Sequence, residues 1–257
     1  MAQSTLSMSQ NGRTEPFELQ VARGQVPYHS SVNIYGYQGA LPNSAGATFY
    51  PVWENQTAYT YPVSATTMLL WSSSASDTSV SILINGLDAS YNQISETLVL
   101  TNGTTGVTTV NSYLRINSIS TAGSVNAVGI INLGNAGKTL QYAEITAGNG
   151  KSQMMVYTVP NGNTFYLLRS NAYTSLNGNT AGNYAFYRVY TKSDVGIIQI
   201  LLQAPFTGQY GTLRVVPRSY AQKTDIQWQV AGNPASGTSQ VGIGVEGYLV
   251  QNDSTPI

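Results

Sequence analysis

The chain contains no cysteine among its 257 residues, which excludes disulfides, thiolate metal sites and cysteine nucleophiles. It holds a single histidine, His29, so histidine-rich zinc sites are excluded and a Ser-His-Asp triad could be built on that residue alone. Charge is also scarce, since Asp, Glu, Lys and Arg make up 9% of the sequence, against about 25% in an ordinary soluble domain. The 11 basic and 11 acidic side chains balance. Without a basic surface to neutralise phosphates, we expect no nucleic-acid partner.

Long apolar runs are lacking as well. No stretch approaches the roughly 20 apolar residues of a transmembrane helix. Residues 1–20 contain no apolar segment of the kind found in secretory signals. We therefore expect no membrane partner and no export through such a signal.

Glycine, tyrosine and small polar residues dominate what is present, with 25 Gly and 18 Tyr. β-Branched and aromatic residues alternate in short runs bounded by Gly, Asn, Pro and Ser, which is typical of β-strands. Because helical periodicity is almost absent between these runs, we predict an all-β fold of two β-sandwich or jelly-roll-like units. The predicted strands cover residues 58–61, 66–72, 79–85, 93–100, 113–120, 129–133, 153–159, 164–172, 184–192, 196–204, 212–218, 225–230 and 241–250.

The glycine-dense residues 134–150 indicate a domain boundary, because the strand pattern lapses there. We place it near residue 145, which divides the body into a β-sandwich domain at 46–145 and a second β-sandwich or jelly-roll domain at 146–257. Asn102-Gly103 and Asn161-Gly162 predict tight turns inside these units, since Asn-Gly adopts the positive φ angles that short hairpins require.

Residues 1–45 form the predicted extended N-terminal arm, because they are polar and lack a core of their own. Near residue 20, apolar residues alternate as they would on the edge of a sheet, and a cluster of tyrosines follows. Such an arm lies on a surface, and both the chain's own body and a neighbouring subunit remain open. The predicted interface residues are Phe17, Leu19, Val21, Tyr28, Tyr35 and Tyr37.

Acidic side chains could supply the carboxylate pair that glycoside hydrolysis requires, but each has a structural interpretation. Asp88 ends the turn sequence Asn-Gly-Leu-Asp, where Asp bonds to its own backbone. Asp225 is interpreted as a surface charge or a turn cap. The acids from which a pair would have to come are Asp88, Glu96, Glu144, Asp194 and Asp225.

Other catalytic and ligand-binding patterns are equally weak. His29 adjoins Ser30 and Ser31, but the Gly-x-Ser-x-Gly context of a nucleophile elbow is missing. Gly242 and Gly244 lie in a strand-like run with no helix after it, so we interpret them as packing or bulge glycines and not as a phosphate loop. We therefore predict no enzymatic activity, no catalytic residues, no cofactor and no metal site.

An aromatic group could form a sugar-stacking platform, although aromatic residues more often fill a core or a subunit interface. Its members are Tyr50, Trp53, Tyr59, Tyr61 and Trp71.

The segment Ile84–Leu114 contains Gly-Leu-Asp-x-x-Tyr-Asn, followed by Ser-Glu-Thr and Asn-Gly-Thr-Thr-Gly-Val-Thr-Thr. In this pattern the chain resembles structural proteins of tailed marine bacteriophages, especially those of cyanobacteria. Phe17–Tyr37 and Gly150–Leu168 resemble the same group. The resemblance implies a virion protein, transfers no catalytic residue, and does not distinguish head from tail.

We therefore predict a non-enzymatic virion structural protein, most specifically a capsid decoration, or cement, protein that stabilises the head through contacts between subunits. The alternative is a tail, baseplate, fibre or adaptor component that binds host-surface glycans, and a carbohydrate-active enzyme or sugar-binding module is the third choice. Expected partners are other copies of the chain, as a homotrimer by analogy with cement proteins, and virion proteins such as the major capsid protein. Assembly in the reducing host cytoplasm is consistent with the lack of cysteine.

Overall fold

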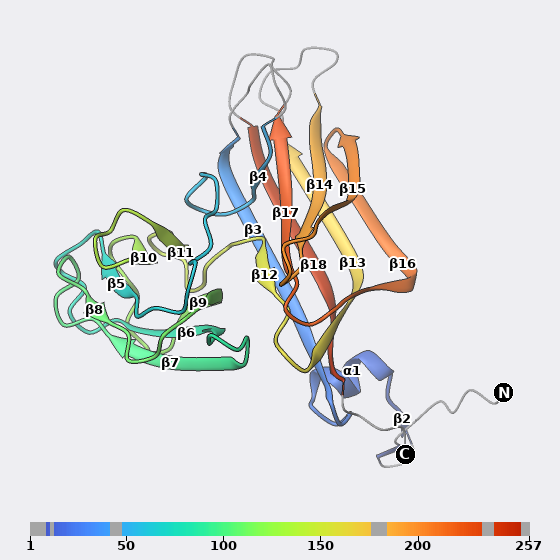
Figure 1. Ribbon diagram of the computed structural model, residues 1–257, viewed down its shortest axis with the longest axis horizontal. Helices are drawn as coiled ribbons and strands as arrows, with labels where there is room; N and C mark the ends of the chain where they lie inside the picture. Colours follow the sequence, from blue (N-terminus) through green and yellow to red (C-terminus); the bar gives the residue numbers. More distant parts are fainter. Residues whose placement is uncertain (1–8, 11–12, 42–47, 176–183, 233–238, 253–257) are drawn as a thin grey trace.

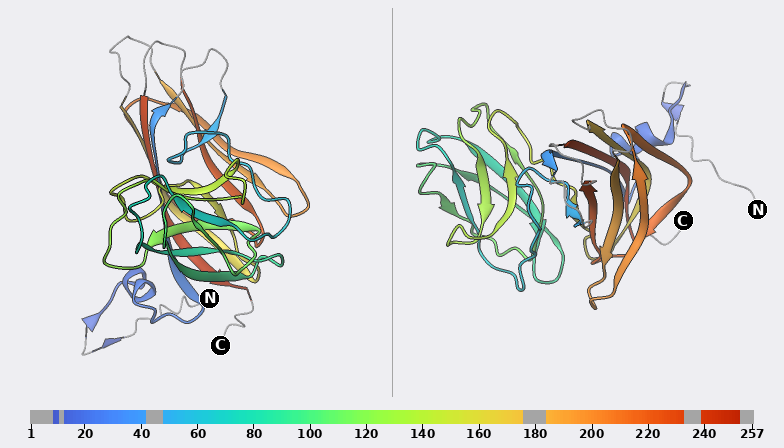
Figure 2. Two further views of the ribbon diagram at one scale, coloured as in Figure 1. Left: turned by 90° about the vertical axis from the view of Figure 1, so that its left-hand side faces the viewer. Right: turned by 90° about the horizontal axis from the view of Figure 1, so that it is seen from above.

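The computed structural model describes residues 9–10, 13–41, 48–175, 184–232 and 239–252. Strands dominate these residues, and two β-sandwiches lie side by side (Figures 1 and 2). We call them the outer sandwich and the inserted sandwich, because the second interrupts the first. The prediction of an all-β protein with two sandwich units is confirmed.

The outer sandwich consists of β3 (His29–Leu41), β4 (Tyr50–Pro51), β12 (Val156–Thr158), β13 (Asn163–Ser175), β14 (Ala185–Lys192), β15 (Ile198–Phe206), β16 (Gln209–Tyr220), β17 (Asp225–Gly232) and β18 (Ser239–Gln251). One sheet has the order β16-β13-β18-β3 and the other β12-β17-β14-β15, with β4 also paired to β17. This is the two-sheet arrangement of a jelly roll. Its longest-range pairing sets β3 antiparallel to β18, with His29 opposite Val250.

The inserted sandwich interrupts a single strand position of the outer sandwich. β4 pairs with Gln229 and Val230 of β17, and β12 pairs with residues 225–227 of the same strand. The two crossing points meet, since the Met155 N–H donates to the Val52 carbonyl at 2.7 Å. The chain therefore leaves the outer sandwich after β4 and returns to it at β12 at nearly the same point. About a hundred residues are inserted between these two strands, and both strands still pair with β17.

Gly36 of β3 makes room for this junction. A Cβ atom at residue 36 would lie 2.7 Å from the Val52 carbonyl oxygen and would collide with the Met155 side chain. Glycine is therefore required here by close approach, and not by an unusual φ angle.

The inserted sandwich consists of β5 (Leu69–Ser72), β6 (Ser81–Leu87), β7 (Gln93–Val99), β8 (Val107–Thr108), β9 (Arg115–Thr121), β10 (Ile131–Gly134) and β11 (Gln141–Ile145). Its sheets have the orders β11-β10-β5-β8 and β7-β6-β9. Polar side chains hold its loops. Asp77, for example, accepts hydrogen bonds from the Ser72 hydroxyl and from the backbone N–H groups of Val128 and Gly129.

Each sandwich has its own core. Phe165, Tyr187 and Trp228 are fully buried in the outer sandwich, and Trp53 and Tyr113 are fully buried in the inserted one. Side chains along β14 alternate between buried and half-buried, because successive residues of a strand point to opposite faces. This alternation is the sequence pattern that predicted the strands.

The chain divides differently from the predicted 1–45, 46–145 and 146–257. Residues 29–41 of the expected arm form β3, a full strand of the outer sandwich, and Val32 and Ile34 pack against its core. The chain returns from the inserted sandwich near Met155, and the expected linker contains β11. The glycines of that linker mark loops within one sandwich, which local composition does not distinguish from a boundary.

Residues Phe17–Ala22 form the helix α1, and not the sheet edge expected from the alternation of Phe17, Leu19 and Val21. Phe17 and Val21 are four residues apart and share a helix face. Val21 is buried, and Phe17 packs edge-on against His29 and Tyr248. This part of the arm therefore lies on the chain's own body, preceded by the short strands β1 (Ser9–Gln10) and β2 (Arg13–Thr14).

Candidate functional site

A buried ion pair joins the two sandwiches. Arg115 begins β9 and Asp225 begins β17, and the guanidinium meets the carboxylate through Nε to Oδ1 at 2.8 Å and Nη2 to Oδ2 at 3.0 Å. Their side chains are only 11% and 4% exposed. The Thr158 hydroxyl also donates to Asp225, and the Tyr61 ring centre lies 4.6 Å from the guanidinium carbon. A bidentate pair constrains orientation as well as distance, so it fixes the sandwiches relative to each other.

Arg115 stays charged although it is buried, because Asp225 stabilises the guanidinium. Burial lowers the pKa of Arg115, but the hydrogen bonds and charge of Asp225 raise it, and the pKa ends above its usual value. The sequence-based interpretation of Asp225 as a surface charge or turn cap is therefore wrong. It follows from the local sequence, whereas the partner lies 110 residues away.

Two further contacts strengthen the junction. The Asn117 side chain donates to the Thr158 carbonyl at 3.0 Å and accepts from the Thr158 N–H at 2.9 Å. The Asn161 N–H donates to the Tyr91 carbonyl at 2.8 Å. The outer end of β12 and the turn after it are therefore held by β9 and by the turn after β6.

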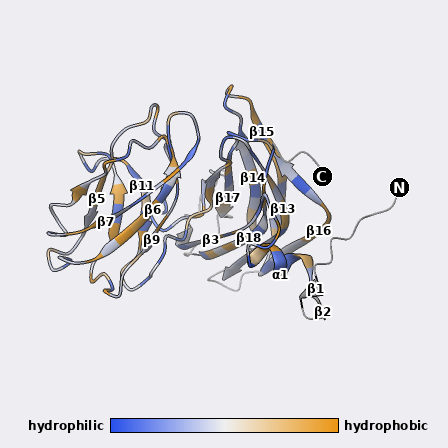
Figure 3. Cartoon of the chain, turned by 90° about the horizontal axis from the view of Figure 1, so that it is seen from below, coloured by the Kyte–Doolittle hydropathy of each residue, from blue (hydrophilic) through white to orange (hydrophobic). Residues whose placement is uncertain are grey.

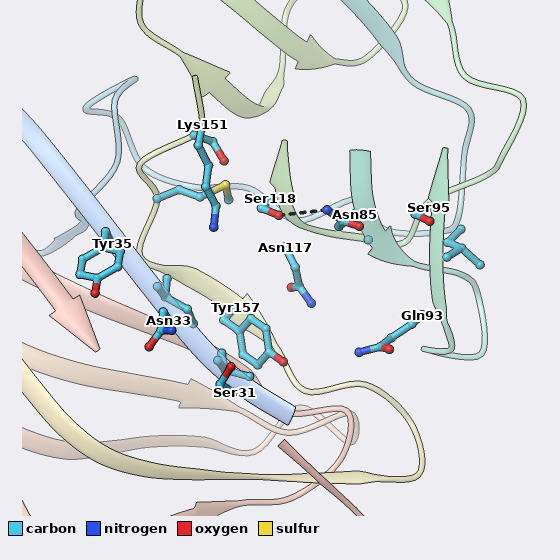
Figure 4. Close-up of a pocket in the computed structure, with 16 residues that line it drawn as sticks. Ser31, Asn33, Tyr35, Asn85, Gln93, Ser95, Asn117, Ser118, Lys151 and Tyr157 are labelled. Carbon is cyan, nitrogen blue, oxygen red and sulfur yellow. Dashed lines mark hydrogen bonds between the residues drawn. The ribbon is translucent and has the colours of Figure 1, made fainter. Parts of the chain in front are cut away.

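A groove of about 400 Å³ lies between β3 on one side and β6, β7 and β9 on the other. Its volume falls within the range of roughly 300–1,000 Å³ typical of ligand pockets, and it lies at a domain junction, where such pockets are common. Figure 4 shows side chains of both sandwiches facing this space. The outer sandwich contributes Ser31, Asn33, Tyr35 and Tyr157, and the inserted sandwich contributes Asn85, Gln93, Ser95, Asn117 and Ser118.

The chemistry of the groove is polar and almost uncharged. Among the described residues that line it, Lys151 is the single charged one, and its amine reaches into the space between the walls (Figure 4). Ser31, Asn33 and Gln93 make no side-chain hydrogen bond to any other described residue, so their donors and acceptors are available to a ligand.

The groove continues past Tyr35. A second depression of about 430 Å³ shares Tyr35, Lys151 and Ser152 with it and extends along Asn149 and Gln153. Burial raises the pKa of the Tyr157 phenol, which therefore stays protonated and can act as a neutral hydrogen-bonding group. No motif in the sequence indicates this site, because its two walls come from segments far apart in the chain.

A second group of side chains to consider lies on the outer sandwich, on the side opposite the inserted sandwich (Figure 1). Hydrophobic and hydrophilic residues follow each other along the strands there (Figure 3), and several of the aliphatic ones are exposed. This surface is formed by β15, β16 and the turn before β15, and each sheet has one of these strands at its edge. Exposed aliphatic patches of this kind mark interaction sites. We call it the aliphatic surface, and its members, all more than half exposed, are Val195, Ile197, Ile198, Ile200, Leu213, Val215 and Val216.

The predicted interface tyrosines lie in different settings. Tyr28 is exposed and has a left-handed φ of 63°, just before β3. Tyr35 and Tyr37 point outward from β3, and Tyr35 packs against β18, where a Cβ atom at Gly244 would lie 3.0 Å from its ring. The interpretation of Gly244 as a packing glycine is therefore confirmed. Phe17 and Leu19 are partly exposed on α1.

The other acidic candidates serve as structural hydrogen-bond acceptors or lie apart. Asp88 accepts from the backbone N–H groups of Ser90 and Asn92, as expected for a turn, and although burial raises its pKa, these bonds hold it below the usual value. Glu96 accepts from the backbone N–H groups of Val110 and Asn111. Asp194 is exposed in the turn before β15.

Glu144, one of the candidate acids, does have a carboxylate neighbour, but it is Glu54, which was not among the candidates. Burial and then the neighbouring Glu54 raise the pKa of Glu144 to about 7. Glu54 accepts hydrogen bonds from Thr146, Asn149 and Gln153, and so holds the loop that leads back to the outer sandwich.

The remaining sequence candidates have structural roles. His29 begins β3, and its Nδ1 lies 2.9 Å from the Pro27 carbonyl. Trp53 and Tyr59 pack edge to face in the inserted sandwich at 5.2 Å, and Tyr61 continues the stack, so these rings do not form an exposed platform. Within the described ranges, His, Asp and Glu gather in no group that could hold a metal ion, and no helix is long and apolar enough to span a membrane.

No protein-family model matches the chain, and a search of curated proteins finds no match. Among solved structures, the chain is similar to infectious bursal disease virus Gt strain, at 11% identity and a TM-score of 0.21 over 94% of this chain and 80% of that one. The Gx strain gives 12% identity and a TM-score of 0.24 over 94% and 78%. The VP2 subviral particle of this virus gives 10% and 0.24 over 89% and 73%. Likeness at this level carries no inference about function.

Proposed function

We propose that the chain is a non-enzymatic structural protein of a bacteriophage particle, and specifically a capsid decoration, or cement, protein that acts as a homotrimer on the major capsid protein. The observation that carries the proposal is the aliphatic surface of β15 and β16. Covering an apolar side chain of this size stabilises a complex by about 1.5–3 kcal/mol before the costs of association. We infer that a second copy of the chain covers this surface.

Two features of the sequence support the same proposal. Three segments of the chain resemble virion proteins of tailed marine phages, and the chain carries no net charge. A neutral surface avoids nonspecific binding to the nucleic acid that surrounds an assembling particle. The proposed location is the virion, after assembly in the host cytoplasm.

The oligomeric state tests the role of the aliphatic surface. We expect Ile198→Ser and Val215→Ser to convert the assembled protein to monomers in mass photometry while its thermal unfolding changes little. Val63→Ser is the matched control, because Val63 is fully exposed on the inserted sandwich, away from this surface. A wild-type monomer, or variants that assemble like wild type, would contradict the proposal.

Copy number in purified virions distinguishes head from tail. Quantitative mass spectrometry giving hundreds of copies per particle matches decoration of the head lattice. About a dozen or fewer copies would match the alternative, a tail, baseplate, fibre or adaptor component. Absence from virions would contradict both.

A further inference from the structure

We propose that the groove between the two sandwiches binds a saccharide chain. The groove and the depression beside it form one continuous site, with volumes of about 400 and 430 Å³ that meet at Tyr35 and Lys151. This is room for more than one sugar ring. The site is separate from the aliphatic surface, so it does not depend on how the chain assembles.

The polar groups of the walls match the hydroxyl groups of sugars. Asn33 on β3 and Gln93 on β7 each offer two N–H donors and a carbonyl acceptor, and neither side chain is used by another described residue. Ser31 adds a free hydroxyl beside Asn33. Amide and hydroxyl side chains can both donate and accept hydrogen bonds, and the hydroxyl groups of a sugar need partners of both kinds.

Tyr35 supplies the apolar part of the site. Tyr35 is 56% exposed, and its ring packs against β18, where Gly244 leaves space for it. The C–H face of a pyranose ring can stack on such an aromatic surface while its hydroxyls reach the amides. Figure 4 shows Tyr35 on the same wall as Asn33, and Asn117 and Gln93 on the other.

The charge of the lining excludes other ligand classes. A nucleic acid or a phosphorylated ligand would need several cations, whereas the described lining offers Lys151 alone. Because no described lining residue carries a carboxylate, cationic ligands have no counter-charge. A ligand rich in hydroxyls and poor in charge fits best.

The site is preformed. Arg115 and Asp225 fix the two walls relative to each other, and Asn117 bonds both ways to Thr158 at the floor of the junction. A preformed groove avoids the entropy of ordering that a flexible site must offset on binding.

The experiment uses the full chain on an array of neutral oligosaccharides (cello-, malto-, chito-, xylo- and manno-hexaoses) and acidic ones (oligoalginates), followed by titration calorimetry on any that bind. We expect saturable binding that Tyr35→Ala and Gln93→Ala each weaken about tenfold, the equivalent of roughly one lost polar or stacking contact. Tyr173→Ala is the matched control, since Tyr173 is 50% exposed on the same sheet but outside the groove. Unchanged thermal unfolding of each variant excludes misfolding.

Each outcome decides. Binding of neutral sugars supports the proposal as stated, and binding of oligoalginates alone, lost in Lys151→Ala, assigns the same groove to acidic saccharides. Binding by no sugar overturns the proposal. So does binding that Tyr173→Ala weakens as much as Tyr35→Ala, because the ligand would then lie on the open sheet face.

Discussion

The outer sandwich includes a pairing between opposite parts of the sequence, β3 against β18, in addition to neighbours such as β14 and β15. All strand pairings of the inserted sandwich fall within residues 69–145, from consecutive strands such as β6 and β7 to the more distant β5 and β10. The inserted sandwich fixes its loops with side chains such as Asp77 and Asp88, and its two chain ends meet at the hydrogen bond between Met155 and Val52. The outer sandwich has to assemble around that point.

This difference bears on folding. Local pairings close short loops and form quickly, whereas a sheet that joins residue 29 to residue 250 pays a large loop-closure entropy first. We infer that the inserted sandwich forms early and that its joined ends bring β4 and β12 into line along β17. We therefore expect substitutions in the ion pair and at Gly36, which both lie at the junction, to change the stability of the protein most.

The largest expected effect comes from breaking the ion pair. Arg115→Met leaves Asp225 buried without its partner, so the free energy of unfolding in urea should fall by about 3–5 kcal/mol. The matched control is Arg169→Met, because the Arg169–Glu246 pair is exposed on both sides and should change stability by about 0–1 kcal/mol. If the free energy of unfolding fell equally in the two variants, burial of the Arg115–Asp225 pair would not add to its contribution to stability.

A smaller loss is expected at the glycine beneath the junction. Gly36→Ala forces a Cβ atom against the Val52 carbonyl and the Met155 side chain, which should cost about 1–3 kcal/mol. Gly39→Ala on the same strand is the control, since a Cβ atom there has its nearest neighbour at 3.6 Å, an ordinary contact. Urea unfolding of both variants checks the difference, and a Gly36→Ala protein as stable as Gly39→Ala contradicts the close approach.

The inserted sandwich should carry a pH dependence of its own. The pKa of Glu144 is raised from 4.5 to about 7, so the folded state binds a proton that the unfolded chain releases. The stabilisation is complete below pH 4.5 and is lost as pH rises through about 7. Calorimetry should show the unfolding temperature falling over this interval by a few degrees, and falling less in Glu144→Gln. An identical slope in the variant would assign the dependence elsewhere.

The smallest effect is expected at the helix that docks on the outer sandwich. Phe17→Ala removes the edge contacts to His29 and Tyr248 and should lower stability by about 0.5–1.5 kcal/mol. Leu19→Ala, on the exposed side of α1, should have less effect. Thermal unfolding measured by circular dichroism distinguishes the two, and equal shifts would mean that α1 does not dock through Phe17.

Much of the secondary structure was readable from the sequence. Alternation predicted β7 and β14 to within one residue, because successive side chains of a strand point to opposite faces of the sheet. The turn role of Asp88 was equally local, since its partners lie within four residues. Pro205 and Pro217 fall in the edge strands β15 and β16, where a missing N–H is tolerated.

The contacts between segments far apart in the sequence could not be predicted. The alternation at Phe17, Leu19 and Val21 also places Phe17 and Val21 on one helix face, so the local pattern could not distinguish α1 from a strand. The pairing of β3 with β18 and the burial of Asp225 against Arg115 depend on contacts across a hundred residues or more. The two walls of the groove likewise come from separate segments, Ser31–Tyr35 and Asn85–Ser118. A strand's sequence records which side chains turn inward, but the choice of partner strand depends on packing of the whole core, and only the tertiary structure decided it.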